Sequence, residues 1–326
     1  MMKPVYGALL ATLLAGTAHA DDTWMTPLSM VSSNAHSSYG DCNVCGETTV
    51  SCGESCGSGL KSLFQHSDPC FDDFVSPMTN PVFFEDPRTL TEARFIFMNH
   101  TVPNNLGGGE IQLYALQLRA ALTERLSLIA TKDGYVVSSS PLVDDGWADL
   151  AGGLKYNVYR DTCNQRLLSV GFTYEAPFGS PRTLQGNGDG EFNLFMTGAT
   201  KLGQNWHLIG ATGLRLPVDD DAENQVWYAS AHVDRRLGNS PFYLVGEFNL
   251  YHWMSSSSAF GAPVEGIDLF NLGSIGVDNN DIVTGAVGLK IKPSRNTEIG
   301  VIIETHLTDR RDVFEDRLGV DWILRY

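Results

Sequence analysis

The chain has 326 residues and a formal net charge of −16, with 38 Asp and Glu against 22 Lys and Arg. Nucleic-acid binding needs a basic patch and none is visible, so the composition argues against a nucleic-acid partner. The 33 Gly residues and a mean hydropathy near zero are typical of short strands joined by turns. No segment after residue 20 approaches the ~18 consecutive apolar residues of a helical membrane span.

The first twenty residues have the parts of an export signal. Lys3 supplies a positive start, residues 5–15 form a short apolar stretch, and Ala18-His19-Ala20 is a small-x-small cleavage site. We therefore expect residues 1–20 to be a signal peptide that is removed on export. The next Cys is Cys42, so the sequence does not predict a lipid-anchored protein.

Residues 21–86 are expected to form a Cys-rich N-terminal extension or plug. The six cysteines are Cys42, Cys45, Cys52, Cys56, Cys70 and Cys163. In an oxidising periplasm an even number favours disulfides, with fifteen possible pairings. The CxxC and CxxxC spacings also leave open a tetrahedral zinc site, or redox work. No thioredoxin-like pattern surrounds the CxxC, so disulfides are the first choice, and no metal or cofactor is assigned.

One disulfide is suggested by position. Cys163 lies in a turn that we expect at the periplasmic end of the fold, and Cys70 is the last cysteine before the strands begin. A Cys70–Cys163 bond would tie the N-terminal segment to that end. Between the cysteines, Leu60, Leu63 and Phe64 have helical spacing, so residues 57–68 could form a short helix. The extension either plugs the lumen of the fold or remains a tethered tail.

Composition changes near residue 87, and period-2 alternation recurs after it. We count about twelve strands, which start near residues 90, 110, 126, 147, 166, 190, 206, 225, 241, 281, 297 and 313. The segments near 126 and 190 alternate poorly, so ten strands is the alternative. An even number of antiparallel strands is what a closed bacterial membrane barrel requires. A soluble sheet protein is the other interpretation of the same alternation.

The last strand alternates most clearly. Phe314, Leu318, Val320 and the final Trp322, Leu324 and Tyr326 share one face, while Arg317, Asp321 and Arg325 share the other. In a membrane barrel the apolar face meets lipid and the charged face lines the lumen. The terminal aromatic residue resembles the C-terminal assembly signal of outer-membrane barrels, so the barrel-assembly machinery and outer-membrane lipid are expected partners.

Connection lengths favour the membrane barrel. The turns near residues 123–125, 161–165, 203–205, 238–240 and 293–296 are short, whereas those near 133–146, 178–189, 217–224 and 255–280 are longer. Outer-membrane barrels alternate in this way, with short periplasmic turns and longer outer loops. The loop near Arg310 is a short exception. The predicted fold is therefore an all-β transmembrane antiparallel barrel over residues 87–326.

The inward positions of the predicted strands carry polar residues of both charge signs. If the lumen is open, these residues shape selectivity, and if it is closed they are paired ions that fill a narrow barrel. The candidates are Glu92, Arg94, Arg119, Asp149, Lys155, Glu175, His232, Glu247, Asn249, Glu304, His306, Arg317 and Asp321.

The stretch that follows Asp72 carries a resemblance. It reads Phe74-Val75-Ser76-Pro77-Met78-Thr79-Asn80-Pro81 and then Phe84-Glu85-Asp86-Pro87-Arg88-Thr89. With the later strands and the aromatic terminus, residues 70–326 resemble the outer-membrane transporters named for the "MetA-pathway of phenol degradation". The resemblance implies passage of small molecules across the outer membrane, aromatic or apolar compounds among them. It implies no catalytic residues.

An enzyme is the least favoured class. Some outer-membrane barrels are lipid hydrolases, and His252 beside Ser255–Ser258 is the one suggestive cluster. The sequence identifies no carboxylate that would orient His252, which nucleophilic catalysis needs. We therefore expect a pore or facilitator for small solutes that needs no cofactor, and a structural or surface-binding barrel with an occluded lumen is the alternative.

Overall fold

The computed structural model describes residues 64–326. The predicted signal peptide lies outside this range, as do Cys42, Cys45, Cys52 and Cys56. No helix within the described range is both long and apolar enough to cross a membrane.

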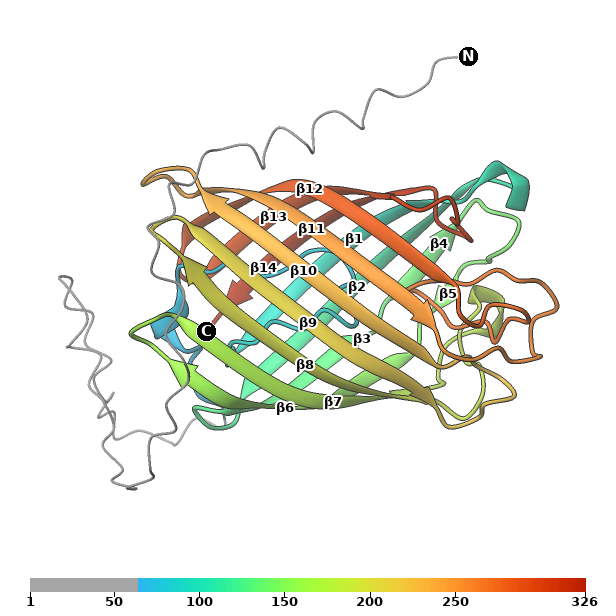
Figure 1. The fold of residues 1–326 in the computed structure, drawn as a ribbon, viewed down its shortest axis with the longest axis horizontal. Helices are drawn as coiled ribbons and strands as arrows, with labels where there is room; N and C mark the ends of the chain where they lie inside the picture. The colour runs from blue at the N-terminus through green and yellow to red at the C-terminus, as the bar shows by residue number, and fades with distance from the viewer. Residues whose placement is uncertain (1–63) are drawn as a thin grey trace, which may run out of the picture. The chain divides into compact units, whose positions relative to one another are not determined.

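The described residues fold into one antiparallel sheet of fourteen strands that closes on itself (Figure 1). Most strands pair with their neighbours along the chain, and β1 pairs with both β2 and β14. The strands are β1 (Glu92–Thr101), β2 (Glu110–Ala121), β3 (Leu126–Lys132), β4 (Tyr135–Ser138), β5 (Gly146–Trp147), β6 (Leu150–Asp161), β7 (Arg166–Ala176), β8 (Glu191–Leu202), β9 (Trp206–Pro217), β10 (Val226–Arg236), β11 (Phe242–Trp253), β12 (Asp281–Ser294), β13 (Thr297–His306) and β14 (Asp316–Arg325). Three 3-10 helices are short: η2 (Pro69–Phe71), η3 (Asn104–Leu106) and η4 (Pro181–Thr183).

Two complete strands of the barrel wall are each interrupted, one into β3 and β4 and the other into β5 and β6, and we call each complete strand of the wall a stave. β3 and β4 both pair with β2, and on their other side β3 pairs with β6 and β4 pairs with β5. The wall therefore has twelve staves, which confirms the predicted number. The expected loop over 133–146 is wrong at its start, because the strand resumes at Tyr135 and the true loop begins after Ser138.

A glycine marks the interruption between β3 and β4. Gly134 has a φ of +123°, and a Cβ on it would lie 2.6 Å from the carbonyl oxygen of Tyr114 on β2. Asp133 beside it accepts a hydrogen bond from the backbone N–H of Leu116 at 2.8 Å, in place of a ladder partner. A side chain at residue 134 would push the stave away from β2, so this bend requires glycine.

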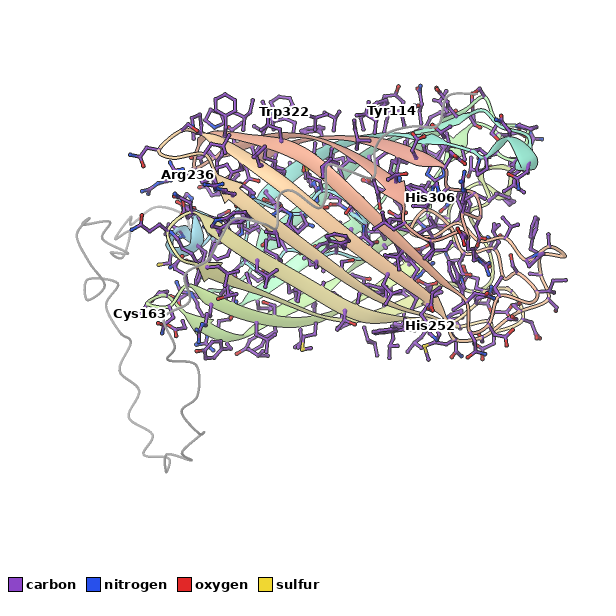
Figure 2. All side chains as sticks on the ribbon, turned by 45° about the horizontal axis from the view of Figure 1, so that its top comes forward. Tyr114, Cys163, Arg236, His252, His306 and Trp322 are labelled. Atoms are coloured by element: carbon purple, nitrogen blue, oxygen red, sulfur yellow. The ribbon has the colours of Figure 1, made fainter. Side chains whose placement is uncertain are left out.

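Long and short connections gather at opposite ends of the barrel (Figure 1). At one end the turns span residues 122–125, 162–165, 203–205, 237–241 and 295–296, and at the other the loops span 102–109, 139–145, 177–190, 218–225, 254–280 and 307–315. Figure 2 shows Cys163 and Arg236 at the short-turn end and His252 and His306 at the loop end. This is the predicted alternation, and we call the two ends periplasmic and outer.

Apolar side chains cover the outside of the barrel. Phe95, Leu128, Phe172 and Ile303 are each at least 43 % exposed, and Trp322 and Tyr114 project outward in Figure 2. The predicted outward aromatics Tyr156, Trp206, Phe242 and Tyr326 are exposed as well. An exposed apolar surface around a closed barrel is what lipid contact demands.

Two local expectations are wrong. Phe314 does not continue the outer face of the last strand, because β14 begins at Asp316 and Phe314 is fully buried against the ring of His100. The described part of the expected helix over 57–68 is extended: the backbone of Gln65 pairs with Ala121, and the Ser67 N–H donates to the carbonyl of Tyr326. These hydrogen bonds to strand ends replace helical ones.

Candidate functional site

The predicted inward residues do point into the barrel. Twelve of the thirteen are at most 8 % exposed, and these are Glu92, Arg94, Arg119, Asp149, Lys155, Glu175, His232, Glu247, Asn249, Glu304, Arg317 and Asp321. His306 is half-buried at the outer rim, where its Nδ1 lies 2.9 Å from the carbonyl oxygen of Glu315. Their burial means that something fills the lumen. Their proposed role in selectivity stays a prediction.

The chain before β1 fills the periplasmic half of the lumen, and we call residues 68–91 the plug. It rises to a turn at Asn80, which has a positive φ of 49° and whose carbonyl accepts from the N–H of Phe83 and Phe84. Arg88 joins the two legs: its guanidinium donates to the Asp86 carboxylate and to the carbonyl of Phe74. All residues from Phe74 to Leu90 are buried.

Ion pairs hold the plug to two sides of the wall. Glu85 of the plug accepts from Arg119 on β2 at 2.6 Å and from Lys155 on β6 at 2.7 Å. On the other side Glu298 of β13 accepts from the Ser76 N–H at 3.1 Å and pairs with Arg325 of β14. Buried charges are tolerated when they are paired and hydrogen-bonded, which these are.

The tip of the plug is bound by Glu247 on β11. Its Oε1 accepts from the N–H of Met78 at 2.8 Å, and its Oε2 accepts from the N–H of Thr79 at 2.6 Å and from the Thr79 hydroxyl. His232 on β10 lies 2.7 Å from the same carboxylate and 3.2 Å from Asp234. Because carboxylates only accept hydrogen bonds, a histidine between two of them donates from both ring nitrogens.

The β11–β12 loop, residues 254–280, closes the outer half. Asp268 of this loop pairs with Arg317 on β14 at 2.7 Å, and the carbonyl of Ile267 accepts from Arg215 on β9 at 2.7 Å. The carbonyl of Leu269 accepts from Gln185 at 2.8 Å. Residues 265–274 are buried, so this longest loop, which we call the inner loop, folds into the barrel and does not stand above it.

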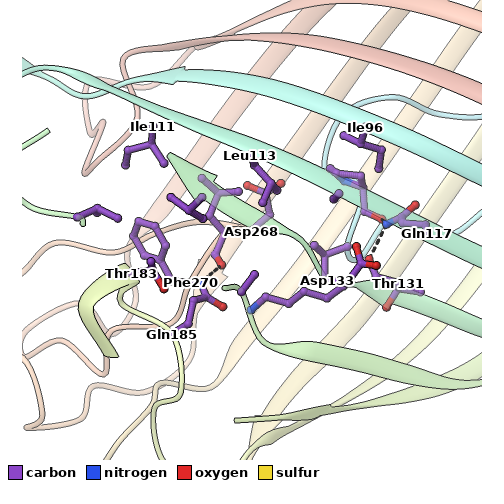
Figure 3. A pocket seen from close by; sticks show the side chains of 18 residues that line it. Ile96, Ile111, Leu113, Gln117, Thr131, Asp133, Thr183, Gln185, Asp268 and Phe270 are labelled. Carbon is purple, nitrogen blue, oxygen red and sulfur yellow. Dashed lines mark hydrogen bonds between the residues drawn. The ribbon is translucent and has the colours of Figure 1, made fainter. Parts of the chain in front are cut away.

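Plug and inner loop meet in an apolar layer. Phe83 of the plug lies 5.4 Å from the ring of Tyr228, and the Arg215 guanidinium sits 4.4 Å above the Phe83 ring. Beside this layer, a cavity of about 30 Å³ is lined by plug residues Pro81 and Val82, by Asp268–Phe270 and by the wall (Figure 3). That volume is room for a water molecule or two. The lumen is therefore occluded from both ends.

One outer-loop carboxyl is unusual. Glu223, in the loop between β9 and β10, is 6 % exposed, and its Oε2 has no hydrogen-bond partner among the described residues. Burial, together with the nearby carboxylates of Glu191 and Glu175, raises its pKa to about 8. The neutral form of the Glu223 carboxyl is therefore favoured much more than that of a solvent-exposed glutamate.

The expectation that His252 lacks an orienting carboxylate is wrong. Its Nδ1 lies 2.7 Å from Asp281, which faces it across β11 and β12. The neighbouring serines are committed elsewhere: Ser255 accepts from the Gln225 N–H, and the Ser256 hydroxyl donates to Asp278. The sequence argument missed Asp281 because it lies 29 residues away along the chain. The described contacts show a His–Asp pair without a serine.

The chain segments that carry Cys70 and Cys163, the two cysteines in the described range, contact each other. Gln165, in the same turn as Cys163, donates from its Nε2 to the carbonyls of Cys70 and Thr162. Arg160 on β6 pairs with Asp68 just before η2. The plug base is thus fastened to β6 and the β6–β7 turn by the contacts of Arg160 and Gln165, and the Cys70–Cys163 disulfide stays a prediction.

The plug residues that bind the wall were not among the predicted site residues. Glu85, Asp86 and Arg88 carry the plug's charge contacts, yet their stretch was interpreted only as a resemblance. A signal was present: three charged residues lie among prolines and phenylalanines in a segment without alternation. Charges in such an apolar context favour burial with partners.

No protein-family model matches the chain, and no curated protein matches it. Among solved structures, an outer membrane channel from Pseudomonas putida F1 is similar with a TM-score of 0.53 and 15 % identity, over 78 % of this chain and 100 % of that one. The NanC porin gives a TM-score of 0.46 at 7 % identity, over 72 % and 99 % of the two chains. The KdgM porin gives a TM-score of 0.43 at 9 % identity, over 72 % of this chain and 99 % of that one. The likeness to the channel is one of fold, and the closed barrel with its apolar outer surface belongs in the bacterial outer membrane.

Proposed function

We propose that this protein is an outer-membrane channel or facilitator for small solutes, with a lumen that is closed at rest by the plug and the inner loop. The observation that supports it most is the chemistry of the wall, whose inward residues are charged or polar along almost every stave. Charged and polar side chains are not stabilised by a dry lumen, and they would line a hydrated path once the plug and the inner loop move.

The nature of the filling supports the same proposal. The plug and the inner loop are not parts of the wall, and polar contacts such as Glu85–Arg119 and Asp268–Arg317 hold them in place. Polar contacts can be exchanged for water when a segment moves, whereas a continuous apolar core cannot. From the family resemblance we propose aromatic or apolar compounds among the solutes. We further propose residues 1–20 as signal peptide, 21–86 as extension or plug, and 87–326 as barrel.

Planar-bilayer recording tests the channel. The mature protein should show brief openings, and a variant lacking residues 21–86 should open more often, because the Glu85 and Glu247 contacts are lost and the β11–β12 loop alone then closes the lumen. Folding of both proteins is checked by the mobility shift of an intact barrel on heating. If neither conducts nor passes solutes into liposomes, the channel is excluded and the structural or surface-binding barrel takes its place; the closure of both ends is the observation that favours that second candidate.

The His252–Asp281 pair calls for one enzymatic control. A lipid-release assay should give no activity for the wild type, because the hydroxyls of Ser255, Ser256 and Ser257 already have partners. Activity that disappears in His252→Ala would establish a hydrolase.

A further inference from the structure

Five buried polar atoms along one sector of the wall have no hydrogen-bond partner among residues 64–326. They are the hydroxyls of Ser127 and Thr131 on β3, the side-chain oxygen of Gln117 on β2, and both ends of the Asn157 amide on β6. Each of these four residues, which we call the polar strip, is at most 2 % exposed. Because β2, β3 and β6 are neighbours in the sheet, the polar strip occupies one continuous sector of the wall.

The opposite wall carries the same residue types with their bonds made. Ser230 on β10 donates to Asn249 on β11 at 2.7 Å, and the Asn249 amide donates to Thr79 of the plug at 2.9 Å. The hydroxyl of Thr284 on β12 donates to Glu304 at 2.6 Å. These residues are buried too. On that wall the hydroxyl and amide groups have partners, whereas on the wall of the polar strip the plug bonds to Arg119, Lys155 and the Nε2 of Gln117 and leaves the other polar atoms of the strip unpaired.

Orphaned polar atoms indicate water. Buried hydroxyl and amide groups are almost always bonded to protein or to ordered water, because leaving them unpaired is unfavourable. The cavity of about 30 Å³ lies at Gln117 and Thr131 (Figure 3) and is large enough for a water molecule. The polar strip is thus the hydrated seam between plug and wall.

One apolar residue divides the polar strip. Ile129 lies between Ser127 and Thr131 on the inward face of β3, is 1 % exposed, and packs in the apolar layer with Phe83. Ser127 and Thr131 are four residues apart, about 13 Å along a strand. A polar path interrupted by one apolar side chain has the form of a hydrophobic constriction, which gates by excluding water.

We propose that solutes cross along the polar strip, between the plug and the β2–β3–β6 wall, with Ile129 as the constriction. This rests on the proposed channel function and adds the route and the solute class. The cations beside the strip are paired, Arg119 with Glu85 and Glu92 and Lys155 with Glu85, so the seam offers hydrogen-bonding groups without an unpaired charge. The class that fits this route is small, uncharged and rich in hydroxyl or amide groups, of the size of glycerol, and it differs from the aromatic or apolar compounds that the resemblance implies.

Thiol labelling tests the hydration of the seam without any transport. In the full mature protein, Ser127→Cys and Thr131→Cys should react with a small methanethiosulfonate reagent, with the labelled residue identified by mass spectrometry. The matched variants Ser230→Cys and Thr284→Cys on the opposite wall should react at least about fivefold more slowly, the factor that one hydrogen bond commonly contributes. Equal labelling of both walls would overturn the proposal.

Liposome swelling with glycerol tests the route. Thr131→Val should slow swelling by about fivefold through loss of one hydrogen-bonding group, while Thr284→Val leaves it at the wild-type rate. Ile129→Ser should speed swelling, and Ile209→Ser, at an equally buried site on β9, should not. Swelling that responds equally at both walls would refute the seam. Selective labelling with no swelling in any variant would keep the hydrated seam and refute the channel instead.

Discussion

Replacing Glu247 by Gln should release the plug. The substitution keeps the shape of the side chain, but it puts an amide NH₂ where one carboxylate oxygen now faces donors. If that is Oε2, the N–H and the hydroxyl of Thr79 lose their acceptor, and His232 loses the charge it faces at 2.7 Å. The plug then has an unpaired donor cluster at its tip.

The magnitude follows from these contacts. A hydrogen bond to a charged group contributes roughly 1.5–3 kcal/mol, and Glu247 is fully buried, so solvent does not screen the loss. Two such bonds lost, with partial replacement by water in the released state, come to about 3 kcal/mol. At 1.4 kcal/mol per factor of ten, the ratio of released to seated plug should rise about a hundredfold.

The assay is the open fraction in planar bilayers, accompanied by the rate of proteolysis within residues 68–91. Glu110→Gln, at an exposed position on β2, is the matched control and should behave as wild type. An open fraction for Glu247→Gln within about threefold of wild type, less than 1 kcal/mol, would refute the view that this carboxylate anchors the plug.

Three further outcomes are expected. Because the folded protein raises the pKa of Glu223 from 4.5 to about 8, its stabilising contribution is full below pH 4.5 and is lost as the pH rises through 8. The unfolding free energy of wild type relative to Glu223→Gln should therefore fall between pH 5 and pH 9, and a constant difference would argue against a buried proton. Deletion of Tyr326, which stacks on His66 at 4.1 Å, should lower the yield of assembled barrel, and normal assembly would contradict its role as a signal. Reduction should change the gel mobility of the wild type if Cys70 and Cys163 are bonded, and unchanged mobility with both thiols open to alkylation would exclude the bond.

The wall could be predicted from the sequence because alternation is a local property. Leu318, Trp322 and Leu324 must face one way if Arg317 and Asp321 face the other, and lipid on one side and the lumen on the other fix which way. The exceptions arise where a distant segment decides the outcome. Phe314 has the right parity for the outer face, but the strand has not yet begun at that residue and the ring packs inward on His100.

The sequence left a plug as one of two alternatives, but the contacts that fill the lumen could not be predicted, because they join residues far apart in the chain. Glu247 and Thr79 are 168 residues apart, and Arg317 and Asp268 are 49 apart. Neither the plug nor the inner loop has a residue pattern that shows it entering the barrel. The inward position of Arg317 was foreseeable, and its partner was not. For the same reason, the sequence did not reveal Asp281 as the partner of His252.

The contacts of Arg325 have a consequence for biogenesis. This residue, one position from the end of the chain, binds Glu92 of the first strand, Glu298 of β13 and the hydroxyl of Ser76 in the plug. Arg325 thus completes the junction between the first and last staves and holds the plug at the same time. A barrel that closed around an empty lumen would leave Arg325 without one of its acceptors. Closure of the barrel and seating of the plug should accordingly favour each other during assembly, through this one shared residue.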